Sequence, residues 1–164
     1  MIPTINKILY ATDLSESAKY AAGYAALLGD KLDAEITVLH VLDDPNSSMR
    51  NLVKNYLSEE KFKEMQEYKI SSYKEMMTNK INQFCAEAEG EVEECRFIAE
   101  RTLLREGNPA VEIIDEAHEG GYDMVIIGSH GHGTLAGVLM GDNARRVVRR
   151  CRVPVTVIRL PEEE

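Results

Sequence analysis

Residues 124–133 read MVIIGSHGHG, a short run of apolar residues that passes directly into a glycine-dense loop. The run Met124–Gly128 is continuously apolar, which is typical of a parallel strand buried on both faces beneath helices. Cys95–Leu104 alternates apolar with charged residues and indicates an edge strand with one wetter face. Three further runs read as strands: Ile5–Ala11, Ala34–Leu42 and Val153–Ile158.

Helical patterns separate these strands. Ser15–Leu32 places its alanines on one face and has Ser15 as a plausible N-cap. Asn108–His118 begins with an N-cap asparagine and a proline at the first helical position, and a last helix is predicted over Asn143–Cys151. Alternating strands and helices predict parallel strands joined by crossovers, so the fold class is α/β, a doubly wound sheet. Pro154 cannot donate a ladder hydrogen bond, which places the last strand at an edge.

The connection between Leu42 and Cys95 is longer than a single crossover requires. Apolar residues three or four apart predict the crossover helix between residues 70 and 88, and a weaker stripe extends upstream. Ser47–Leu57 is predicted to form a separate short helix. We therefore describe one domain, residues 1–164, with a helical insert at about 43–70. The insert is either a decorated entry to a long helix, or a flap over a ligand cleft or a partner surface.

Composition excludes several classes of protein. The 164 residues include 19 basic and 28 acidic side chains, for a formal charge of −9, which argues against nucleic acid as a partner. No apolar run reaches the ~20 residues that span a bilayer, and the start lacks a signal-peptide pattern. We therefore expect a cytoplasmic protein without membrane association. The cysteines Cys85, Cys95 and Cys151 are odd in number and unclustered, which favours buried thiols over a disulfide framework or a zinc site.

Ligands of an open α/β sheet bind outside the carboxyl ends of its strands, where the strand order reverses. The loops to consider therefore follow Ala11, Leu42 and Ile127. The third loop contains Gly128, Gly131 and Gly133, and glycines allow bare backbone N–H groups to approach an anion. A following helix adds the partial positive charge of its N-terminus. These features predict a ligand that carries phosphate.

Two glycine patterns compete in this loop. The dinucleotide fingerprint fits Gly131, Gly133 and Ala136, which would suggest an NADP-type oxidoreductase, but it falls on the fourth strand and no helix follows at once. The spacing Gly128-x2-Gly131-x9-Gly141 fits better. Together with Asp13 and Val41 it resembles the nucleotide-binding pattern of the universal stress protein family. The Gly107-Asn108-Pro109 helix start and the Val-Pro-Val of the last strand also resemble that family, so the resemblance covers essentially the whole chain.

The resemblance implies a five-stranded sheet of order 3-2-1-4-5, adenine nucleotide α-hydrolase-like, and a homodimer through the edge strand Val153–Ile158. It implies a regulatory stress-response protein that binds ATP or another adenine nucleotide (AMP, cyclic AMP), with Mg²⁺ as a candidate counter-ion and a protein partner that is unknown. Asp13 and Val41 would line the adenosine, Ile127 the ribose, and Gly128, Gly131 and Gly141 the phosphates. The candidate site is completed by their neighbours Ala11, Thr12, His130, Asp142 and Asn143.

Asp142 departs from the family pattern, in which Ser or Thr follows the last glycine. As N-cap of the last helix its carboxylate would occupy the N–H donors that a phosphate needs. Like charge at ~4–6 Å costs on the order of a few kcal/mol in a partly screened site. Magnesium, or Arg145 and Arg146, could offset that cost. Otherwise the site either favours a nucleotide with fewer phosphates or is blocked. If it is blocked, the chain is a dimeric interaction protein of the same fold that binds no nucleotide.

The remaining polar residues indicate no catalytic centre. His130 and His132 lie two apart but lack a third metal ligand nearby, so exposed loop histidines are the favoured interpretation. Ser129 precedes a histidine, but no GxSxG elbow is present, and we predict that the chain is not an enzyme. Five arginines cluster between Arg145 and Arg152. They form a solvated helix face, an anion-attracting rim, or a docking face for an acidic partner.

Overall fold

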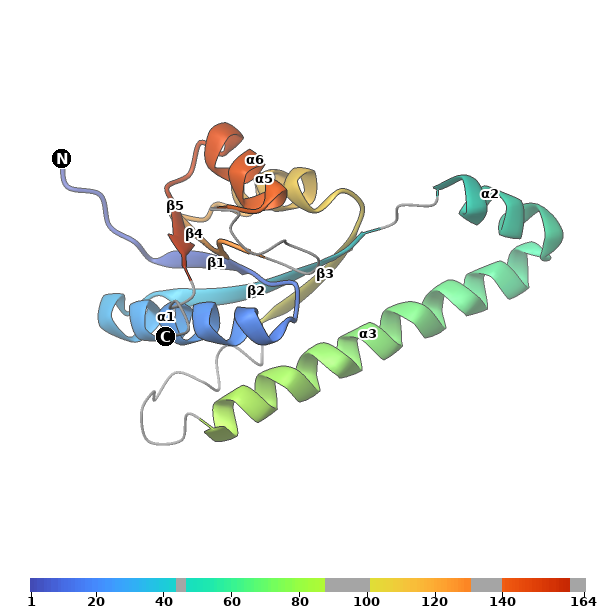
Figure 1. Cartoon of the computed structure of the whole chain (residues 1–164), viewed down its shortest axis with the longest axis horizontal. Coiled ribbons are helices and arrows are strands. Elements are labelled where there is room, and N and C mark those ends of the chain that lie inside the picture. Colours follow the sequence, from blue (N-terminus) through green and yellow to red (C-terminus); the bar gives the residue numbers. More distant parts are fainter. Residues whose placement is uncertain (44–46, 88–100, 131–139, 160–164) are drawn as a thin grey trace.

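The computed structural model of the chain describes residues 1–43, 47–87, 101–130 and 140–159. One parallel sheet contains five strands in the order β3-β2-β1-β4-β5 (Figure 1). This confirms the predicted α/β class and the predicted strand order. The strands are β1 (Lys7–Ala11), β2 (Glu35–Leu42), β3 (Thr102–Glu106), β4 (Met124–Gly128) and β5 (Val155–Ile158).

Helices cover both faces of the sheet and bury a separate core on each. Helices α1 (Glu16–Leu32) and α3 (Glu59–Glu87) lie on one face, and α5 (Pro109–Glu119) and α6 (Asp142–Arg150) lie on the other (Figure 1). Alternate residues of β1 point to the two cores, with Ile8 beneath α1 and Leu9 beneath α5. Both residues are fully buried. Burial of the strands on both faces explains their unbroken apolar runs.

The predicted helix starts are confirmed at α1 and α5. The Oγ of Ser15 accepts a hydrogen bond from the N–H of Ala18 at 3.2 Å, so Ser15 is the N-cap of α1. The Oδ1 of Asn108 accepts from the N–H of Val111 at 3.3 Å and caps α5 in the same way. The alanine face of α1 is buried against the sheet, with Ala25 and Ala26 fully inaccessible. Small side chains at these positions allow the helix to approach the strands closely.

The third strand and the cysteines differ from the sequence prediction. β3 runs from Thr102 to Glu106 and pairs over this whole length with β2. We predicted a strand over Cys95–Leu104. Residues 95–100 lie outside the described part of the chain. The edge position of β3 is confirmed. Cys151 is a free thiol, as expected, but Cys85 is disulfide-bonded in the structure, so the expectation of thiols only is wrong at that residue.

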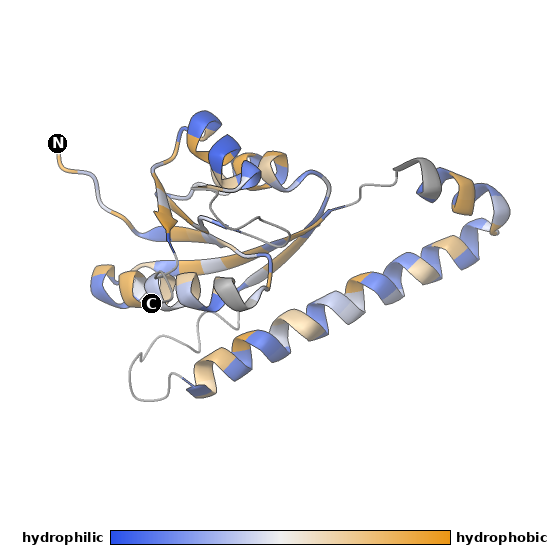
Figure 2. Cartoon of the chain, in the orientation of Figure 1, coloured by the Kyte–Doolittle hydropathy of each residue, from blue (hydrophilic) through white to orange (hydrophobic). Residues whose placement is uncertain are grey.

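Helices α2 (Ser47–Tyr56) and α3 form an arm that extends well beyond the sheet (Figure 1). The two apolar stripes predicted upstream and downstream of residue 70 belong to one continuous helix of 29 residues. Met77 and Ile81 anchor its second half in the core beneath the sheet. The distal part of α3 mixes polar and apolar residues along its length (Figure 2), and Tyr56 and Tyr68 are 86 % and 75 % exposed.

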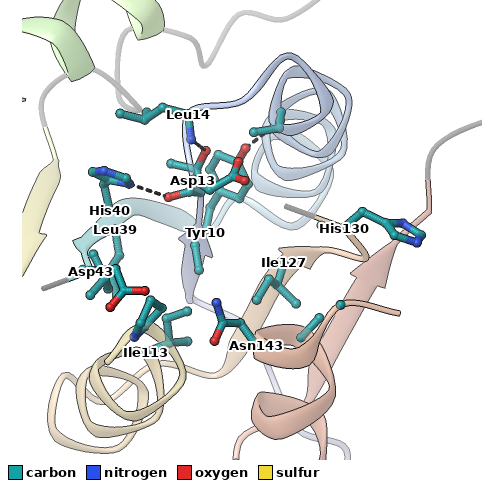
Figure 3. Close-up of a pocket in the computed structure, with 18 of the residues that line it drawn as sticks. Tyr10, Asp13, Leu14, Leu39, His40, Asp43, Ile113, Ile127, His130 and Asn143 are labelled. Carbon is teal, nitrogen blue, oxygen red and sulfur yellow. Dashed lines mark hydrogen bonds between the residues drawn. The ribbon is translucent and has the colours of Figure 1, made fainter. Parts of the chain in front are cut away.

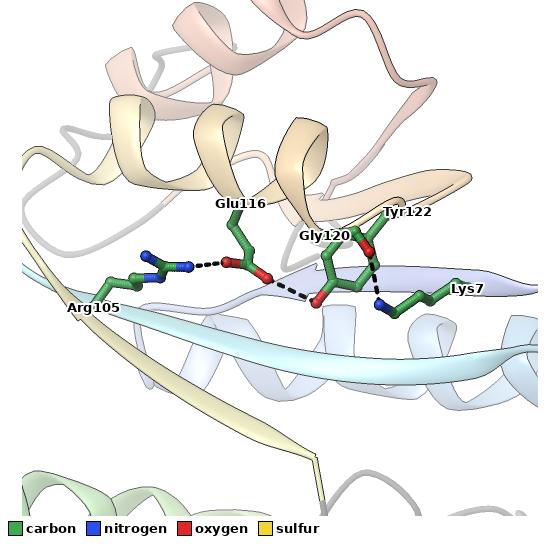
Figure 4. Close-up of polar contacts among 5 residues, drawn as sticks. All are labelled: Lys7, Arg105, Glu116, Gly120 and Tyr122. Carbon is green, nitrogen blue, oxygen red and sulfur yellow. Dashed lines mark hydrogen bonds and ion pairs between the residues drawn. The ribbon is translucent and has the colours of Figure 1, made fainter.

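A buried polar network connects α5 to the sheet on the opposite face (Figure 4). Glu116 is 6 % exposed, and its carboxylate pairs with Arg105 of β3 and accepts a hydrogen bond from the Tyr122 hydroxyl at 3.0 Å. The Nζ of Lys7 donates to the carbonyl of Gly120 at 2.7 Å and lies 4.4 Å from the centre of the Tyr122 ring. Burial raises the pKa of the Tyr122 phenol, and the carboxylate of Glu116 adds to that rise.

Tyr10 supplies a test of this structure in alkaline solution. Its ring is 3 % exposed beneath α1, its hydroxyl donates to the carbonyl of Ala18 at 2.7 Å, and burial raises its pKa strongly. A phenol whose pKa is raised on folding stabilises the native state fully below its unfolded pKa of about 10, and this stabilisation is lost as the pH rises further. In urea titrations we expect Tyr10→Phe to be about 1 kcal/mol less stable than the unchanged chain at pH 7.

Above about pH 10 the difference in unfolding free energy between the unchanged chain and Tyr10→Phe should shrink by roughly 1.4 kcal/mol for each pH unit and then change sign. The reason is that only the unchanged chain must keep this phenol protonated. A difference that stays constant from pH 7 to pH 11 would contradict the buried, neutral state of Tyr10. Exposed Tyr56→Phe is the matched control and should show no such crossing.

Candidate nucleotide-binding site

A cavity of about 860 Å³ opens at the carboxyl ends of β1, β2 and β4 (Figure 3). The break in strand order between β1 and β4 places the first and fourth strand loops on either side of it. Ten of the eleven candidate site residues line this cavity, although they are far apart in the sequence. They are Ala11, Thr12, Asp13, Val41, Ile127, Gly128, His130, Gly141, Asp142 and Asn143. Gly131, like His132, lies outside the described residues.

The loop between β1 and α1 is fixed by its own side chains. The Oδ1 of Asp13 accepts hydrogen bonds from the N–H of Ser15 at 3.0 Å and from its Oγ at 2.6 Å. Leu14 follows with φ of 63°, a left-handed conformation unusual for a residue with a side chain, and its N–H donates to the Oγ1 of Thr12 at 3.1 Å. The loop therefore presents Asp13 to the cavity in a defined position (Figure 3).

The opposite side of the cavity is formed by the end of β4 and the start of α6. The N–H of Gly141 donates to the carbonyl of Ser129 at 2.7 Å, which brings the start of α6 beside Gly128. Gly141 is the N-cap of α6 and provides no side-chain hydrogen bond. The N–H groups of the first turn of a helix have no acceptor within the helix. Asn143 and His130 flank this donor-rich end of the cavity (Figure 3).

Asp142 does not take the position predicted for it. It is the first residue of α6 rather than its N-cap, and its side chain is 77 % exposed. Its Oδ1 accepts from the Nη2 of Arg145 at 2.5 Å. The hypothesis that this carboxylate occupies the helix N–H donors is therefore wrong, because the cap is Gly141 and the carboxylate is directed to a neighbouring arginine. The ion pair with Arg145 also reduces the repulsion that an incoming phosphate would meet.

The serine–histidine pair has hydrogen-bond geometry that the sequence alone did not reveal. The Oγ of Ser129 lies 2.7 Å from the Nδ1 of His130. Ser129, however, is 1 % exposed, so its hydroxyl is not available to attack a substrate. The contact instead fixes the histidine ring at the rim of the cavity.

The cavity has a further wall that the sequence analysis missed. Four residues of α3 line it, namely Lys69, Tyr73, Met76 and Lys80. Their spacing of four, three and four residues places them on one face of the helix, and this spacing was the available signal. His40 of β2 also lines the cavity, and its Nδ1 lies 2.9 Å from the carbonyl oxygen of Thr12.

The five arginines of the predicted basic cluster are divided between two environments. Arg145 lines the cavity and pairs with Asp142. The other four side chains, Arg146, Arg149, Arg150 and Arg152, are exposed on or just beyond α6. Their role as a solvated face or a docking face remains a prediction.

The comparison with known families agrees with this geometry. The model of the universal stress protein family matches residues 4–159, nearly the whole chain. The chain belongs to the universal stress protein family. Universal stress protein MJ0577 of Methanocaldococcus jannaschii is 28 % identical over 153 residues, which are 93 % of this chain and 94 % of that protein. Universal stress protein YxiE of Bacillus subtilis is 27 % identical over 154 residues, covering 94 % and 99 %.

Solved universal stress proteins share the fold. The structure of the hypothetical protein MJ0577 matches with a TM-score of 0.74 at 25 % identity, covering 98 % of this chain and 100 % of the other. A universal stress protein solved in complex with cAMP matches with a TM-score of 0.57 at 17 % identity, covering 96 % and 98 %. Among the described residues, no helix combines the length and apolar character needed to cross a membrane.

Proposed function

We propose that this universal stress protein binds an adenine nucleotide in the cavity beside Gly128 and acts as a regulatory protein rather than as an enzyme. The nucleotide is ATP or a related species such as AMP or cyclic AMP. We further propose that the protein works in the cytoplasm as a homodimer joined through β5, and that an unidentified protein partner reads its ligand state.

Gly128 carries this proposal, because nothing in the described part of the fold requires a glycine there. Its φ is not in the left-handed region, and among the described residues a Cβ built on it would meet only the carbonyl oxygen of His130, at an ordinary distance of 3.5 Å. A glycine that neither the backbone nor the packing demands, at the wall of a cavity, is explained by the close approach of a ligand. The start of α6, whose N-cap glycine has no side-chain acceptor, lies on the same side and suits a phosphate.

The two ends of the cavity suit the two ends of a nucleotide. The α6 side offers backbone N–H donors, whereas the carboxylates of Asp13 and Asp43 lie on the β1–β2 side and would repel a phosphate there (Figure 3). Carboxylates accept hydrogen bonds from hydroxyl and amino groups, which ribose and adenine carry. The volume of about 860 Å³ lies within the usual range for small-molecule sites. The cAMP complex supports the proposal, since it places an adenine nucleotide on this fold.

Magnesium fits the phosphate end without a dedicated protein cage. Mg²⁺ usually binds through one or two carboxylates together with substrate phosphates. Asp142 is the carboxylate that the structure places at this rim. We propose that it would hold the ion through the phosphates of a bound nucleotide.

A glycine-to-alanine exchange tests the proposal. Gly128→Ala should leave the urea midpoint nearly unchanged, because the added methyl group makes no forbidden contact with the described residues. The same variant should weaken ATP binding at least tenfold in calorimetric titration. Gly23→Ala in α1 is the matched control. In the described part of the chain a Cβ there meets nothing within 4 Å, so this variant should be slightly more stable and should bind ATP as the unchanged chain does. Equal ATP affinity in Gly128→Ala would contradict the assignment of this wall to the phosphates.

A further inference from the structure

One face of α3 forms a wall of the cavity, and both ends of this wall are attached to the domain. The Nζ of Lys80 donates to the carbonyl of Leu14 at 2.5 Å, in the loop that carries Asp13. At the other end the Nζ of Lys69 lies 3.4 Å from the Oε1 of Glu106 in β3. The neighbouring residues Met77 and Ile81 are buried in the core beneath the sheet. The wall is therefore held at a fixed distance from the strand ends.

Tyr73 lies between these two attachment points. It lines the cavity and is half-buried, and its ring is stacked with His40 at a centroid distance of 6.2 Å and an angle of 27°. His40 in turn contacts the carbonyl of Thr12 in the β1–α1 loop (Figure 3). Among the described residues, no hydrogen-bond partner is found for the Tyr73 hydroxyl. An aromatic ring and an unused hydroxyl thus border the cavity on its β1–β2 side.

We propose that Tyr73 is a specificity-determining residue that packs against the nucleobase of the bound ligand. This inference rests on the proposed function and adds the wall that recognises the base. The lysines of this wall are already engaged, Lys69 with Glu106 and Lys80 with the carbonyl of Leu14, and the carboxylates of Asp13 and Asp43 lie on the same side. The phosphates are therefore better placed at the start of α6, and the part of the ligand that reaches Tyr73 is its uncharged ring. A nucleobase offers a flat aromatic face, which stacks well on tyrosine and gains affinity from it.

The contact also connects the ligand to the arm. Tyr73 belongs to the helix that continues without a break to Glu59 and then to α2. A nucleotide held by Gly128 at one end and by Tyr73 at the other therefore bridges the sheet and the arm. An anion without a base would occupy only the α6 side and would not make this bridge.

Calorimetric titrations with ATP and with inorganic tripolyphosphate test the assignment. Tyr73→Ala should weaken the affinity for ATP about tenfold, the usual effect of losing one base–aromatic contact. The same variant should change the affinity for tripolyphosphate by less than twofold. Tyr73→Leu keeps the apolar volume but removes the flat ring, and should weaken ATP about fivefold. Tyr73→Phe should stay within about threefold of the unchanged chain. Tyr68→Ala, on the exposed part of the same helix, is the matched control and should bind as the unchanged chain does.

The possible failures are distinguishable. If the unchanged chain binds ATP and Tyr73→Ala and Tyr73→Leu bind it equally well, the role of Tyr73 is overturned and the proposed function stands. If Tyr73→Ala loses affinity for ATP and for tripolyphosphate to the same extent, the recognition of the base by Tyr73 is likewise overturned. If the unchanged chain binds none of ATP, AMP and cyclic AMP, the proposed function fails and the role of Tyr73 fails with it.

Discussion

Glu116→Ala is expected to lower the free energy of unfolding by about 3 kcal/mol in urea titrations at pH 7. The side chain is buried against the sheet, where its carboxylate pairs with Arg105 and accepts from the hydroxyl of Tyr122. Its removal leaves a buried hydroxyl without its acceptor and a guanidinium without its counter-charge. Breaking a buried pair costs about 3–5 kcal/mol, and the 44 % exposure of Arg105 places this site at the lower end of that range.

Three variants separate the parts of this network. Tyr122→Phe removes one hydrogen bond and should cost about 1 kcal/mol. Glu116→Gln keeps an acceptor for Tyr122 but turns amide hydrogens toward Arg105. Its loss of stability should therefore lie between those of Tyr122→Phe and Glu116→Ala. Glu119→Ala on the exposed side of the same helix should stay within about 0.5 kcal/mol of the unchanged chain. A loss below 1 kcal/mol for Glu116→Ala would contradict the assignment of Glu116 as a buried partner on which the stability depends.

The sequence predicted the elements that carry strong local signals. Continuous apolar runs located β1, β2 and β4, and capping residues located the starts of α1 and α5 to within one residue. The end of β3 was harder to predict, because Arg105 and Glu106 are charged and a strand is not expected to continue through them. They belong to the strand because tertiary partners, Glu116 for the arginine and Lys69 for the glutamate, compensate their charges. Such partners cannot be read from the residues next to them in the sequence.

The cavity was predictable on three sides and not on the fourth. The rule that ligands lie at the carboxyl ends of parallel strands, together with the glycine spacing, selected residues from β1, β2, β4 and α6 that the structure brings together. The wall on α3 depends on how the long crossover packs across the strand ends. The stripe of Lys69, Tyr73, Met76 and Lys80 is visible in the sequence, but nothing in the spacing says which surface it faces. The position of Asp142 was misjudged for a different reason. The start of α6 lies one residue earlier than predicted, which makes Gly141 the N-cap and Asp142 the first helical residue.

Among the described residues, no strand pairs with the outer side of β5, which is the second edge of the sheet. The carbonyls of Pro154, just before β5, and of Ile158 accept hydrogen bonds from the N–H groups of Val125 in β4 and of Ser129 just after it. Backbone groups alternate in direction along a strand, so those of Val155 and Val157 point away from β4. An edge strand with such groups pairs readily with a second strand. A second copy of this chain would place the same strand opposite it across a two-fold axis.

Val157→Pro is therefore expected to convert a dimer into a monomer while leaving the fold intact. Proline removes the outward N–H of residue 157 and none of the hydrogen bonds to β4, and an edge strand tolerates it there. Light scattering should give twice the chain mass of 18.4 kDa for the unchanged protein and a single chain mass for the variant. Thr102→Pro makes the matched change on the other edge, since odd-numbered residues of β3, beginning with Arg101, pair with β2. This variant should remain dimeric, and a monomer from Thr102→Pro with a dimer from Val157→Pro would move the interface to β3.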